Sequence, residues 1–324
     1  MENMRILITG GSGFIGTSLV EHFIELSRQF TNLDIRAPHK SSHQNYWQKS
    51  DILDTENVFL KFKAFQPTHV VHLAAKASIE GKSLEDYKEN TVGTSNILSA
   101  CTNTPSVSRI IITSTQHVRK PGSGLQANDA DYDPLMMYGE SKVVMEEIVR
   151  SRDIKCIWTI IRPTNIWGPW HPHLPYGLWR LMKKGLYFHP AGDQVIRSYG
   201  YVENAVWQID QILNAPKELV DRKTYYIGEL PSSQYDWVNQ FSLGLTGRPV
   251  RLLPKELIRI LAYTGDILKR MGISFPMYSS RYNNLITTNI VPVSPTFEVF
   301  GAPPYTTNDG IAKTVRWLET QNIF

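Results

Sequence analysis

The stretch Gly10-Gly11-Ser12-Gly13-Phe14-Ile15-Gly16 decides the fold of this chain. An apolar run over residues 5–9 precedes it and a helical pattern over residues 17–27 follows it, so we expect a strand, a tight turn and a helix. Gly10 permits the turn, Gly13 lets a pyrophosphate approach the backbone because it lacks a Cβ, and Gly16 lets the helix lie close to the strand. Phosphates then meet free N–H groups at the positive end of the helix dipole, beside Phe14 and Ile15. The stretch therefore predicts nucleotide binding, with a purely structural turn as the alternative.

Composition narrows the class of protein. The 324 residues are 42% hydrophobic and 20% charged, as in ordinary globular proteins of one large or two smaller domains. A net charge of +4 is too small to indicate nucleic acid and suits an anionic small substrate. Cys101 and Cys156 lie in apolar segments and form neither a metal-ligand pattern nor a disulfide framework. With a first strand near residue 4 and no apolar run of about 20 residues, we expect a cytoplasmic protein without signal peptide, metal or integral membrane segment.

A second strand, over residues 30–36, ends near Asp34, which lies 18 residues beyond Gly16. A carboxylate about that far from the glycines accepts hydrogen bonds from both adenosine ribose hydroxyls and repels a 2′-phosphate, which favours NAD over NADP. Arg36 weakens this preference, because an arginine there binds the extra phosphate. A solvated loop acid is the alternative for Asp34. Residues 51–52 fit the end of a third strand, with Asp51 near the adenine or, almost as well, on the free surface.

Further runs alternate between strands and helices. His69-Val70-Val71-His72-Leu73-Ala74-Ala75 is typical of a central parallel strand covered on both faces, and its small final residues leave space for a cofactor. A helical pattern over residues 83–101 and an isoleucine-rich strand over residues 108–113 follow. This alternation over the first 165 residues or so predicts an α/β fold, with a Rossmann-type doubly wound parallel sheet.

Tyr138 and Lys142 are four residues apart at the start of a predicted helix over residues 138–150, so they share one helical face. A phenol is a poor base at neutral pH, and a nearby ammonium group favours the phenolate and lowers the phenol pKa. Thr115, at the end of the preceding strand, places a hydroxyl for the same substrate oxygen. Together these groups move a proton on or off a sugar hydroxyl while hydride is exchanged at carbon.

The chain resembles the extended short-chain dehydrogenase/reductase family, in particular its NAD-dependent epimerase/dehydratase branch, which acts on nucleotide sugars. The matching pieces cover about half of the chain in the family's order. They are the glycine stretch, Asp34, Asp51, His72-Leu73-Ala74-Ala75, Asn90, Ser114-Thr115, Tyr138-Gly139-Glu140-Ser141-Lys142 and Arg162-Pro163-Thr164-Asn165-Ile166-Trp167-Gly168-Pro169.

The resemblance implies roles for particular residues. Thr115, Tyr138 and Lys142 become the catalytic triad of an enzyme that binds NAD and a nucleotide-diphosphate sugar. The implied cofactor residues are Gly10, Gly13, Phe14, Ile15, Gly16, Asp34, Arg36, Asp51, Ile52, Leu73, Ala74, Ala75, Lys76, Asn90, Tyr138, Lys142 and Pro163. The implied substrate residues are Ser78, Thr115, Gln116, His117, Asn165, Arg197 and Arg281. Both arginines are expected on the diphosphate, with a salt bridge as the alternative for each.

The resemblance also implies two regions and a homodimer. Residues 1–165, with residues 195–215 returning, form the NAD-binding Rossmann domain; residues 166–194 and 216–324 form the nucleotide-sugar-binding region. Helices like those over residues 83–101 and 138–150 commonly pair across a two-fold axis in this family. Residues 167–175, rich in Trp, His and Pro, are either a substrate-facing loop or a rigid connection. A basic amphipathic helix over residues 254–271 is expected to present a solvated face, with a membrane surface as the alternative.

The residues that follow Thr115 reduce the number of reactions that the resemblance allows. Dehydratases of the family carry two acids there, whereas this chain has Gln116 and His117, which disfavours dehydration. An NAD-dependent epimerase that works through a transient 4-keto sugar and an NAD(P)H-dependent 4-keto-sugar reductase both remain. A non-catalytic NAD-binding regulatory protein is the alternative from another class. His117 is either an additional acid or base on the sugar or a packed histidine.

Overall fold

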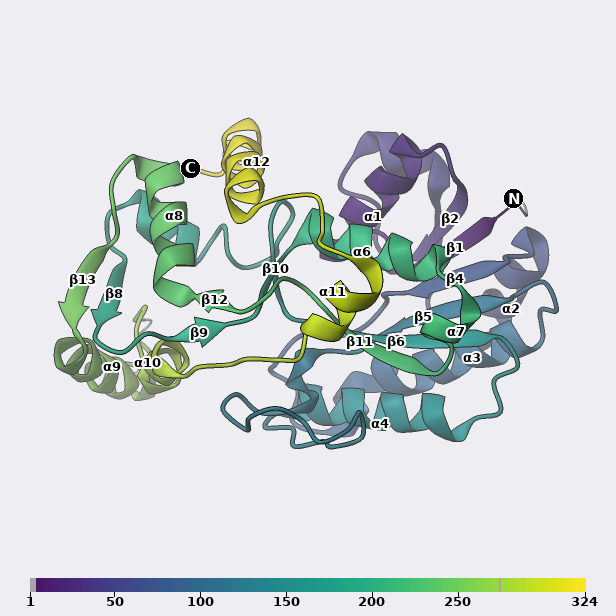
Figure 1. Ribbon diagram of the computed structural model, residues 1–324, viewed down its shortest axis with the longest axis horizontal. Helices are drawn as coiled ribbons and strands as arrows, with labels where there is room; N and C mark the ends of the chain where they lie inside the picture. Colours follow the sequence, from purple (N-terminus) through teal and green to yellow (C-terminus); the bar gives the residue numbers. More distant parts are fainter. Residues whose placement is uncertain (1–3, 274) are drawn as a thin grey trace.

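A seven-stranded sheet forms the larger part of the molecule in the computed structural model, which describes residues 4–273 and 275–324 (Figure 1). Its strands, in spatial order, are β3 (Trp47–Lys49), β2 (Gln29–Asp34), β1 (Arg5–Thr9), β4 (His69–His72), β5 (Arg109–Thr113), β6 (Ile157–Pro163) and β11 (Lys223–Ile227). Every pairing is parallel. The chain runs outward from β1 to one edge and then from β4 to the other, so a crevice for a ligand opens at the carboxyl ends of these two strands.

Helices cover both faces of the sheet. One face carries α1 (Phe14–Glu25), α6 (Val202–Asn214), α7 (Lys217–Val220) and α11 (Ser294–Phe300); the other carries α2 (Thr55–Phe65), α3 (Thr94–Thr102) and α4 (Met137–Ser151). Successive strand residues point to opposite faces, so Ile6 and Ile8 enter one core while Leu7 enters the other. The continuous apolar runs of the sequence follow from this double burial.

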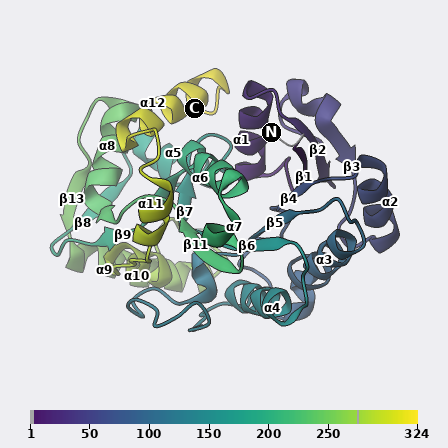
Figure 2. The same ribbon diagram turned by 45° about the vertical axis from the view of Figure 1, so that its right-hand side comes forward.

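A smaller region lies beside the sheet, at the left of Figure 1, and Figure 2 shows the two parts from a second side. It contains three two-stranded pairs: β7 (Asn165–Trp167) with β10 (Tyr199–Tyr201), β9 (Ile196–Arg197) with β12 (Ser232–Ser233), and β8 (Phe188–Ala191) with β13 (Arg251–Pro254). Its helices are α5 (Leu178–Lys183), α8 (Gln234–Thr246), α9 (Lys255–Arg270), α10 (Ser279–Ile286) and α12 (Thr307–Thr320). Trp167, Trp237 and Phe241 pack edge to face at its centre. Among the described residues, no helix is both long and apolar enough to cross a bilayer.

Several sequence predictions need correction. The third strand ends at Lys49 and not at residues 51–52, because the Asp51 carboxylate accepts a hydrogen bond from the Leu53 N–H and closes a turn there. The helix predicted over residues 83–101 is broken into a 3₁₀ turn (Leu84–Tyr87), a π-helical turn (Glu89–Gly93) and α3. Two further 3₁₀ turns are Ser41–Tyr46 and Gln116–Val118. Strand β11 extends the large sheet, so residues 223–227 belong with it although the predicted boundaries place them in the sugar-binding region.

Candidate active site

The glycine stretch lies at the carboxyl end of β1 and packs against the end of β4. Gly10 has φ +78°, and a Cβ there would lie 2.6 Å from the Ala74 nitrogen, so only glycine fits. A Cβ at Gly16 would overlap the Gly10 carbonyl oxygen and the Gly11 backbone. The close approach at Gly16 is therefore between α1 and the turn itself, and not between the helix and the strand as predicted.

The start of α1 fits a pyrophosphate. Gly13 is the N-cap, no side chain caps the helix, and no acidic residue lies in its first turn. A Cβ at Gly13 would meet only the Gly10 carbonyl oxygen at 3.2 Å and the Arg36 guanidinium at 4.0 Å, so this side of the turn is open. Uncapped N–H groups beside Phe14 and Ile15 at the positive end of a helix are suited to bind phosphate oxygens. The Phe14 ring also contacts His171 edge-on at 4.9 Å between centroids, so the segment after β7 reaches this helix terminus.

Asp34 ends β2 beside the glycine turn. Its carboxylate is buried and accepts hydrogen bonds from the Ser12 N–H at 3.0 Å and from the Arg36 N–H at 2.9 Å. Each carboxylate oxygen retains an acceptor site, so the group remains able to bind ribose hydroxyls. Arg36 is exposed at the rim, with its guanidinium near Gly13. The structure thus brings together the acid that favours NAD and the cation that favours an additional phosphate.

Asn90 links the segment after β4 to helix α4 through hydrogen bonds. The Asn90 amide accepts from the Lys76 N–H at 2.9 Å and donates to the Lys76 carbonyl at 3.0 Å and to the Ser141 hydroxyl at 2.9 Å. Both N–H donors are therefore occupied, so we expect Asn90 to support the cofactor segment rather than to touch the cofactor. Leu73 and Ala74 bond to Thr9 at the end of β1, and Ala75 is exposed.

The remaining predicted cofactor residues lie at or just beyond the ends of strands. Ile52 packs against Gly93 in the core beneath α3, and Asp51 is exposed beside it. Pro163 is the last residue of β6, opposite Ile227 of β11. The carboxyl ends of β1, β2, β4, β5 and β6 share one edge because the sheet is parallel, so all of these segments face the same crevice.

The predicted triad meets at this edge. Thr115 follows β5, its side chain is buried, and its hydroxyl accepts a hydrogen bond from the His117 N–H at 3.2 Å. The same hydroxyl lowers the pKa of Tyr138, which lies in the first turn of α4. Lys142 lies one turn later, almost fully buried, and its ammonium group donates to the Thr113 carbonyl at 2.8 Å. The rings of Tyr87 and His117 lie near Tyr138, each 6.2 Å away between centroids.

Burial controls the protonation of the triad. It raises the pKa of Tyr138 above its usual value, and the Thr115 hydroxyl acts in the opposite direction. Burial also lowers the pKa of Lys142 to about 8, against the attraction of Glu146, which raises it. The prediction that Lys142 lowers the Tyr138 pKa is therefore wrong for this arrangement, because the ammonium group is directed at the Thr113 carbonyl and desolvation of the phenolate dominates.

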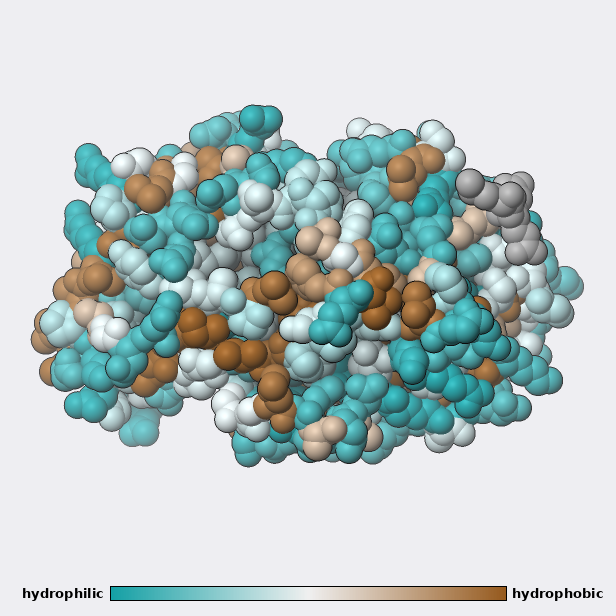
Figure 3. Space-filling view, in the orientation of Figure 1, coloured by the Kyte–Doolittle hydropathy of each residue, from teal (hydrophilic) through white to brown (hydrophobic). Residues whose placement is uncertain are grey.

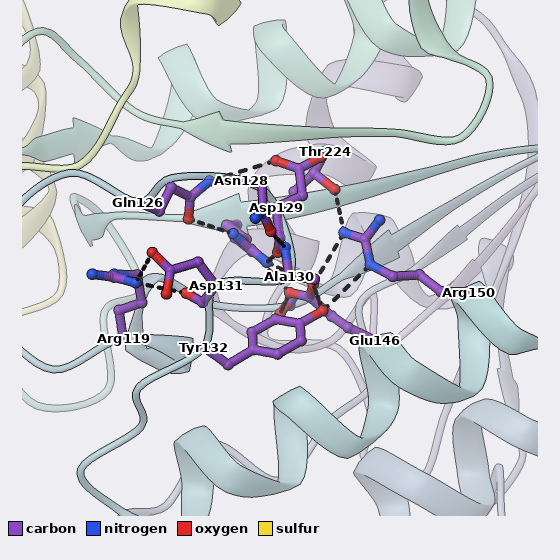
Figure 4. A network of polar contacts seen from close by, with 12 residues as sticks. Arg119, Gln126, Asn128, Asp129, Ala130, Asp131, Tyr132, Glu146, Arg150 and Thr224 are labelled. Atoms are coloured by element: carbon purple, nitrogen blue, oxygen red, sulfur yellow. Dashed lines mark hydrogen bonds and ion pairs between the residues drawn. The ribbon is translucent and has the colours of Figure 1, made fainter.

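A buried network of hydrogen bonds and ion pairs surrounds Glu146 of α4 (Figure 4). Glu146, one turn after Lys142, accepts two hydrogen bonds from Arg162 at 2.8 and 2.7 Å. It also accepts from the hydroxyls of Ser114 at 2.6 Å and Tyr132 at 3.0 Å. These contacts hold the pKa of the Glu146 carboxyl below its usual value although burial raises it. Because Ser114 precedes Thr115, the network holds the ends of β5, β6 and α4 together.

The same network anchors the loop over residues 119–133. Arg162 donates to the Gln126 side chain at 2.9 Å and to the Asp129 carbonyl at 2.6 Å, and Arg119 pairs with Asp131 at 2.6 Å. Sequence reasoning missed Glu146. Two signals pointed to it: its place four residues after Lys142 on the same helical face, and the lone charge of Arg162 in an apolar strand, which needs a buried counter-ion.

Gln116 and Asn165 extend the site from the triad toward the smaller region. The Gln116 amide donates to the Asn165 side chain at 2.8 Å, and Asn165 donates to the Ser198 carbonyl at 3.4 Å. The buried Gln116 Oε1 has no hydrogen-bond donor among the described residues, so it is available to a substrate hydroxyl. Burial lowers the pKa of His117, which favours its neutral form.

The two arginines predicted on the diphosphate contact main-chain carbonyls. Arg197 is buried and donates to the carbonyls of Asn284 and Thr287 near the end of α10. Arg281 is exposed, donates to the Pro276 carbonyl at 2.6 Å and lies 4.7 Å from the Tyr278 ring centroid. Arg281 also lines a cavity of about 600 Å³ beside α5 and the end of α9. Arg281 is therefore accessible to solvent, whereas the Arg197 guanidinium already donates hydrogen bonds to two main-chain carbonyls.

Ser78 lies at the other border of the site. Its hydroxyl accepts from the Glu80 N–H at 3.2 Å, and its carbonyl accepts from the Tyr87 hydroxyl at 2.7 Å. Because the Tyr87 ring packs near Tyr138, Ser78 is connected to the triad by a single aromatic side chain. The described residues contain no group of His, Cys, Asp and Glu side chains arranged to hold a metal ion.

Comparison with known proteins identifies relatives along the whole chain. Residues 6–228 match the model of the NAD dependent epimerase/dehydratase family. The N-acetyl-alpha-D-glucosaminyl-diphospho-ditrans,octacis-undecaprenol 4-epimerase of Escherichia coli O157:H7 is 26% identical, over 97% of this chain and 95% of that protein. The UDP-glucose 4-epimerase of Vibrio cholerae is 28% identical, over 98% of this chain and 96% of that protein.

Solved structures share the fold. The UDP-glucose 4-epimerase of Thermus thermophilus, in complex with NAD, superposes with a TM-score of 0.72 at 23% identity, over 98% of this chain and 99% of that chain. The UDP-glucose 4-epimerase of Thermotoga maritima, with UDP-glucose, has a TM-score of 0.74 at 21% identity, over 98% and 100% of the two chains. At these identities the likeness shows the α/β architecture and no more.

Proposed function

This chain belongs to the NAD-dependent epimerase/dehydratase family of the extended short-chain dehydrogenases/reductases, and on that basis we propose that it is a nucleotide-sugar 4-epimerase. NAD is its cofactor, as the family description states. The observation that supports the proposal is that Thr115, Tyr138 and Lys142 lie at the carboxyl ends of the parallel strands, at the same sheet edge as the glycine turn.

Residues of this chain have distinct tasks in the proposed reaction. The turn at Gly10 and Gly13 holds the pyrophosphate and Asp34 the ribose, and NAD supplies the acceptor and donor of hydride at the sugar C4. Tyr138 would take the proton of the C4 hydroxyl while the C4–H bond breaks, which would leave a 4-keto sugar, and the Thr115 hydroxyl, which lowers the Tyr138 pKa against burial, would favour the phenolate that this needs. Thr115 donates a hydrogen bond to the same sugar oxygen. After the keto sugar turns over, Tyr138 returns the proton as hydride is added to the opposite face.

The residues after Thr115 favour epimerisation over dehydration. Elimination of water across C5 and C6 needs an acid and a base, and Gln116 and His117 offer no carboxylate. Gln116 instead presents an unpaired carbonyl oxygen among the described residues and is fixed by Asn165. These features suit recognition of a neutral sugar hydroxyl. We therefore assign Gln116 and Asn165 to sugar binding and His117 to packing beside Tyr138.

The substrate is a diphosphate-linked sugar. Relatives with near-complete alignment carry the names UDP-glucose 4-epimerase and a 4-epimerase of a diphospho-undecaprenol-linked sugar, so both carriers share a diphosphate. Arg281, exposed at the large cavity, is the better placed of the two arginines for that group, because Arg197 already bonds two carbonyls. The sugar-binding region then comprises mainly the residues outside the sheet. A homodimer contact through residues 83–101 and 138–150 remains part of the proposal.

The test is turnover without added nucleotide. Purified protein incubated with UDP-glucose and other UDP-sugars should form the C4 epimer using NAD carried through purification. Tyr138→Phe and Thr115→Val should lower kcat by about 10²–10⁴ and leave substrate binding within a few fold. Tyr46→Phe is the matched control, because that ring stacks on Phe30, 4.4 Å away between centroids, and Tyr46 lies outside the triad. Strict stoichiometric consumption of a reduced cofactor would refute epimerisation.

The second candidate is a 4-keto-sugar reductase, which the position of Arg36 favours. Its guanidinium lies 4.0 Å from the Cβ position at Gly13, where it could meet the 2′-phosphate of NADP. Equal use of NADPH and NADH, together with one-way reduction of a 4-keto sugar, would support the reductase. Arg36→Ala should then weaken NADPH binding at least tenfold and leave NADH binding within a factor of three.

A further inference from the structure

Helix α9 exposes a row of large apolar side chains. Leu257, Ile260, Leu261, Ile267 and Met271 follow the spacing of one helical face and are all exposed. Ile260 and Ile267 are the most open members of the helical part of this row, at 59% and 58% exposure. Figure 3 shows apolar residues among hydrophilic ones at the end of the molecule where Figure 1 places α9. A surface helix normally turns such a face to the core, so this face lacks a partner among the described residues.

The orientation of α9 is set by packing on its other side. Ile258 and Ala262 are buried against Tyr282 of α10. A Cβ at Gly265 would overlap the Met277 carbonyl oxygen, so the backbone of α9 lies directly on the segment that leads to α10. The Asp266 carboxylate accepts hydrogen bonds from the N–H and the hydroxyl of Ser279 at the start of α10. The helix cannot rotate to hide its apolar row without breaking these contacts.

The surroundings of the apolar row are cationic. Residues 251–271 contain five basic side chains and two acidic ones, and one of the acids, Asp266, is already bonded to Ser279. The five basic residues, Arg251, Lys255, Arg259, Lys269 and Arg270, are all exposed. Arg259 and Arg270 border the row on the side of Tyr263, together with a single exposed acid, Glu256, so this border carries a net positive charge. An apolar face with basic and aromatic side chains at its border is the pattern of a helix that lies in the plane of a membrane interface.

We propose that the apolar face of α9 docks on an anionic lipid bilayer, with Arg259 and Arg270 against the headgroups. Each Lys or Arg held near an anionic surface adds attraction, and the apolar row then leaves water for the acyl boundary. A second copy of this chain is a poorer occupant, because a two-fold contact would bring the basic border of one α9 toward the same border of the other. The helix of 16 residues lies on the bilayer and does not cross it.

The cavity described above lies at the carboxyl end of α9, on the side of the helix that packs toward α10, and this deepens the proposed function, on which it rests. Lys269, Gly272 and Ile273, at the end of α9 and just beyond it, line the cavity together with Arg281. A diphosphate-linked sugar held by Arg281 would then be bound about 10 Å, one helix diameter, from the docking face. The enzyme would take its substrate at the membrane, where a diphosphate carried on a lipid is presented at the headgroup level.

Vesicle flotation tests the inference directly. The full chain is mixed with vesicles of phosphatidylethanolamine and phosphatidylglycerol, or of phosphatidylcholine alone, and floated in a density gradient. We expect the protein to float with the anionic vesicles, to stay behind with phosphatidylcholine, and to be released as salt is raised to about 0.5 M, because screening weakens the basic contacts.

Two variants and one control locate the face. Ile260→Gln with Ile267→Gln should lower binding to anionic vesicles about tenfold or more, and Arg259→Gln with Arg270→Gln should lower it about fivefold for each cation. Leu60→Gln with Leu219→Gln is the control, because Leu60 is also 58% exposed but lies on α2 and Leu219 lies on α7. The control should float as the wild type does.

Epimerisation of a soluble UDP-sugar separates this inference from the proposed function. All three double variants should retain wild-type turnover in the absence of vesicles, since none touches the triad. Wild-type protein that does not float with anionic vesicles overturns the membrane inference and leaves the epimerase proposal standing. Floating protein that has no turnover refutes the epimerase and keeps the docking face. If Ile260→Gln with Ile267→Gln converts a dimer to a monomer in light scattering, the face is a subunit contact and the inference is wrong.

Discussion

Glu146 offers the sharpest test of how the active site is held together. Its carboxylate is fully buried and accepts hydrogen bonds from Arg162, Ser114 and Tyr132. In Glu146→Gln the charge of Arg162 stays buried without its counter-ion, which costs about 3–5 kcal/mol. At about 2 °C for each kcal/mol in a chain of this size, Tm should fall by about 6–10 °C. Glu147→Gln is the matched control: the same substitution at the next position of α4, exposed, with an expected change within about 0.5 kcal/mol.

Thermal unfolding by circular dichroism and urea titration at pH 7 measure this difference. The pKa of Glu146 is lowered in the fold, so its stabilisation is present above its unfolded pKa and is lost as pH falls through the lower folded value. The gap between wild type and Glu146→Gln should therefore close only below pH 4.5, the reference pKa for this carboxyl. A Gln variant that melts within about 1 °C of wild type at pH 7 would refute the reasoning, because the network would then be dispensable.

Further predictions concern protonation and the glycine turn. The pKa of Lys142 falls from 10.5 to about 8 on folding, so the unfolded chain binds more protons between these values and wild-type stability should rise with pH across that window by about 3 kcal/mol. Urea titrations of Lys142→Met should lack this rise; an equal rise would assign it to other groups. Gly16→Ala should lower both Tm and NAD affinity, since its Cβ overlaps the Gly10 carbonyl. Gly13→Ala should lower NAD affinity with a smaller change in Tm, and calorimetry that shows unchanged NAD binding would contradict the phosphate assignment. Because burial lowers the pKa of His117, His117→Gln should leave the pH profile of kcat unchanged above pH 6.5. If the substitution removes the rise or the fall of kcat with pH, His117 acts as an acid or a base.

Local patterns predicted most of the sheet. The runs at residues 5–9, 69–75 and 108–113 became β1, β4 and β5, since strands buried on both faces need apolar residues at every position. The predictions failed where a side chain outside the segment intervened. The helix predicted over residues 83–101 contains a π-helical turn at Asn90, whose amide is bonded to Lys76 and Ser141, and no periodicity within the segment shows those partners.

The features of the candidate site also separate into those that the local sequence predicts and those that depend on tertiary packing. The sequence alone determined the glycine turn, the alternation of strands and helices, and the presence of Thr115, Tyr138 and Lys142, because turn chemistry and hydrophobic period are local properties of a chain. Only the tertiary structure decided the protonation of the triad, since burial raises the Tyr138 pKa and outweighs the Thr115 hydroxyl, which lowers it. It likewise decided that Glu146 and Arg162 form a buried pair, because residues 16 positions apart in the chain meet only when α4 packs on the sheet.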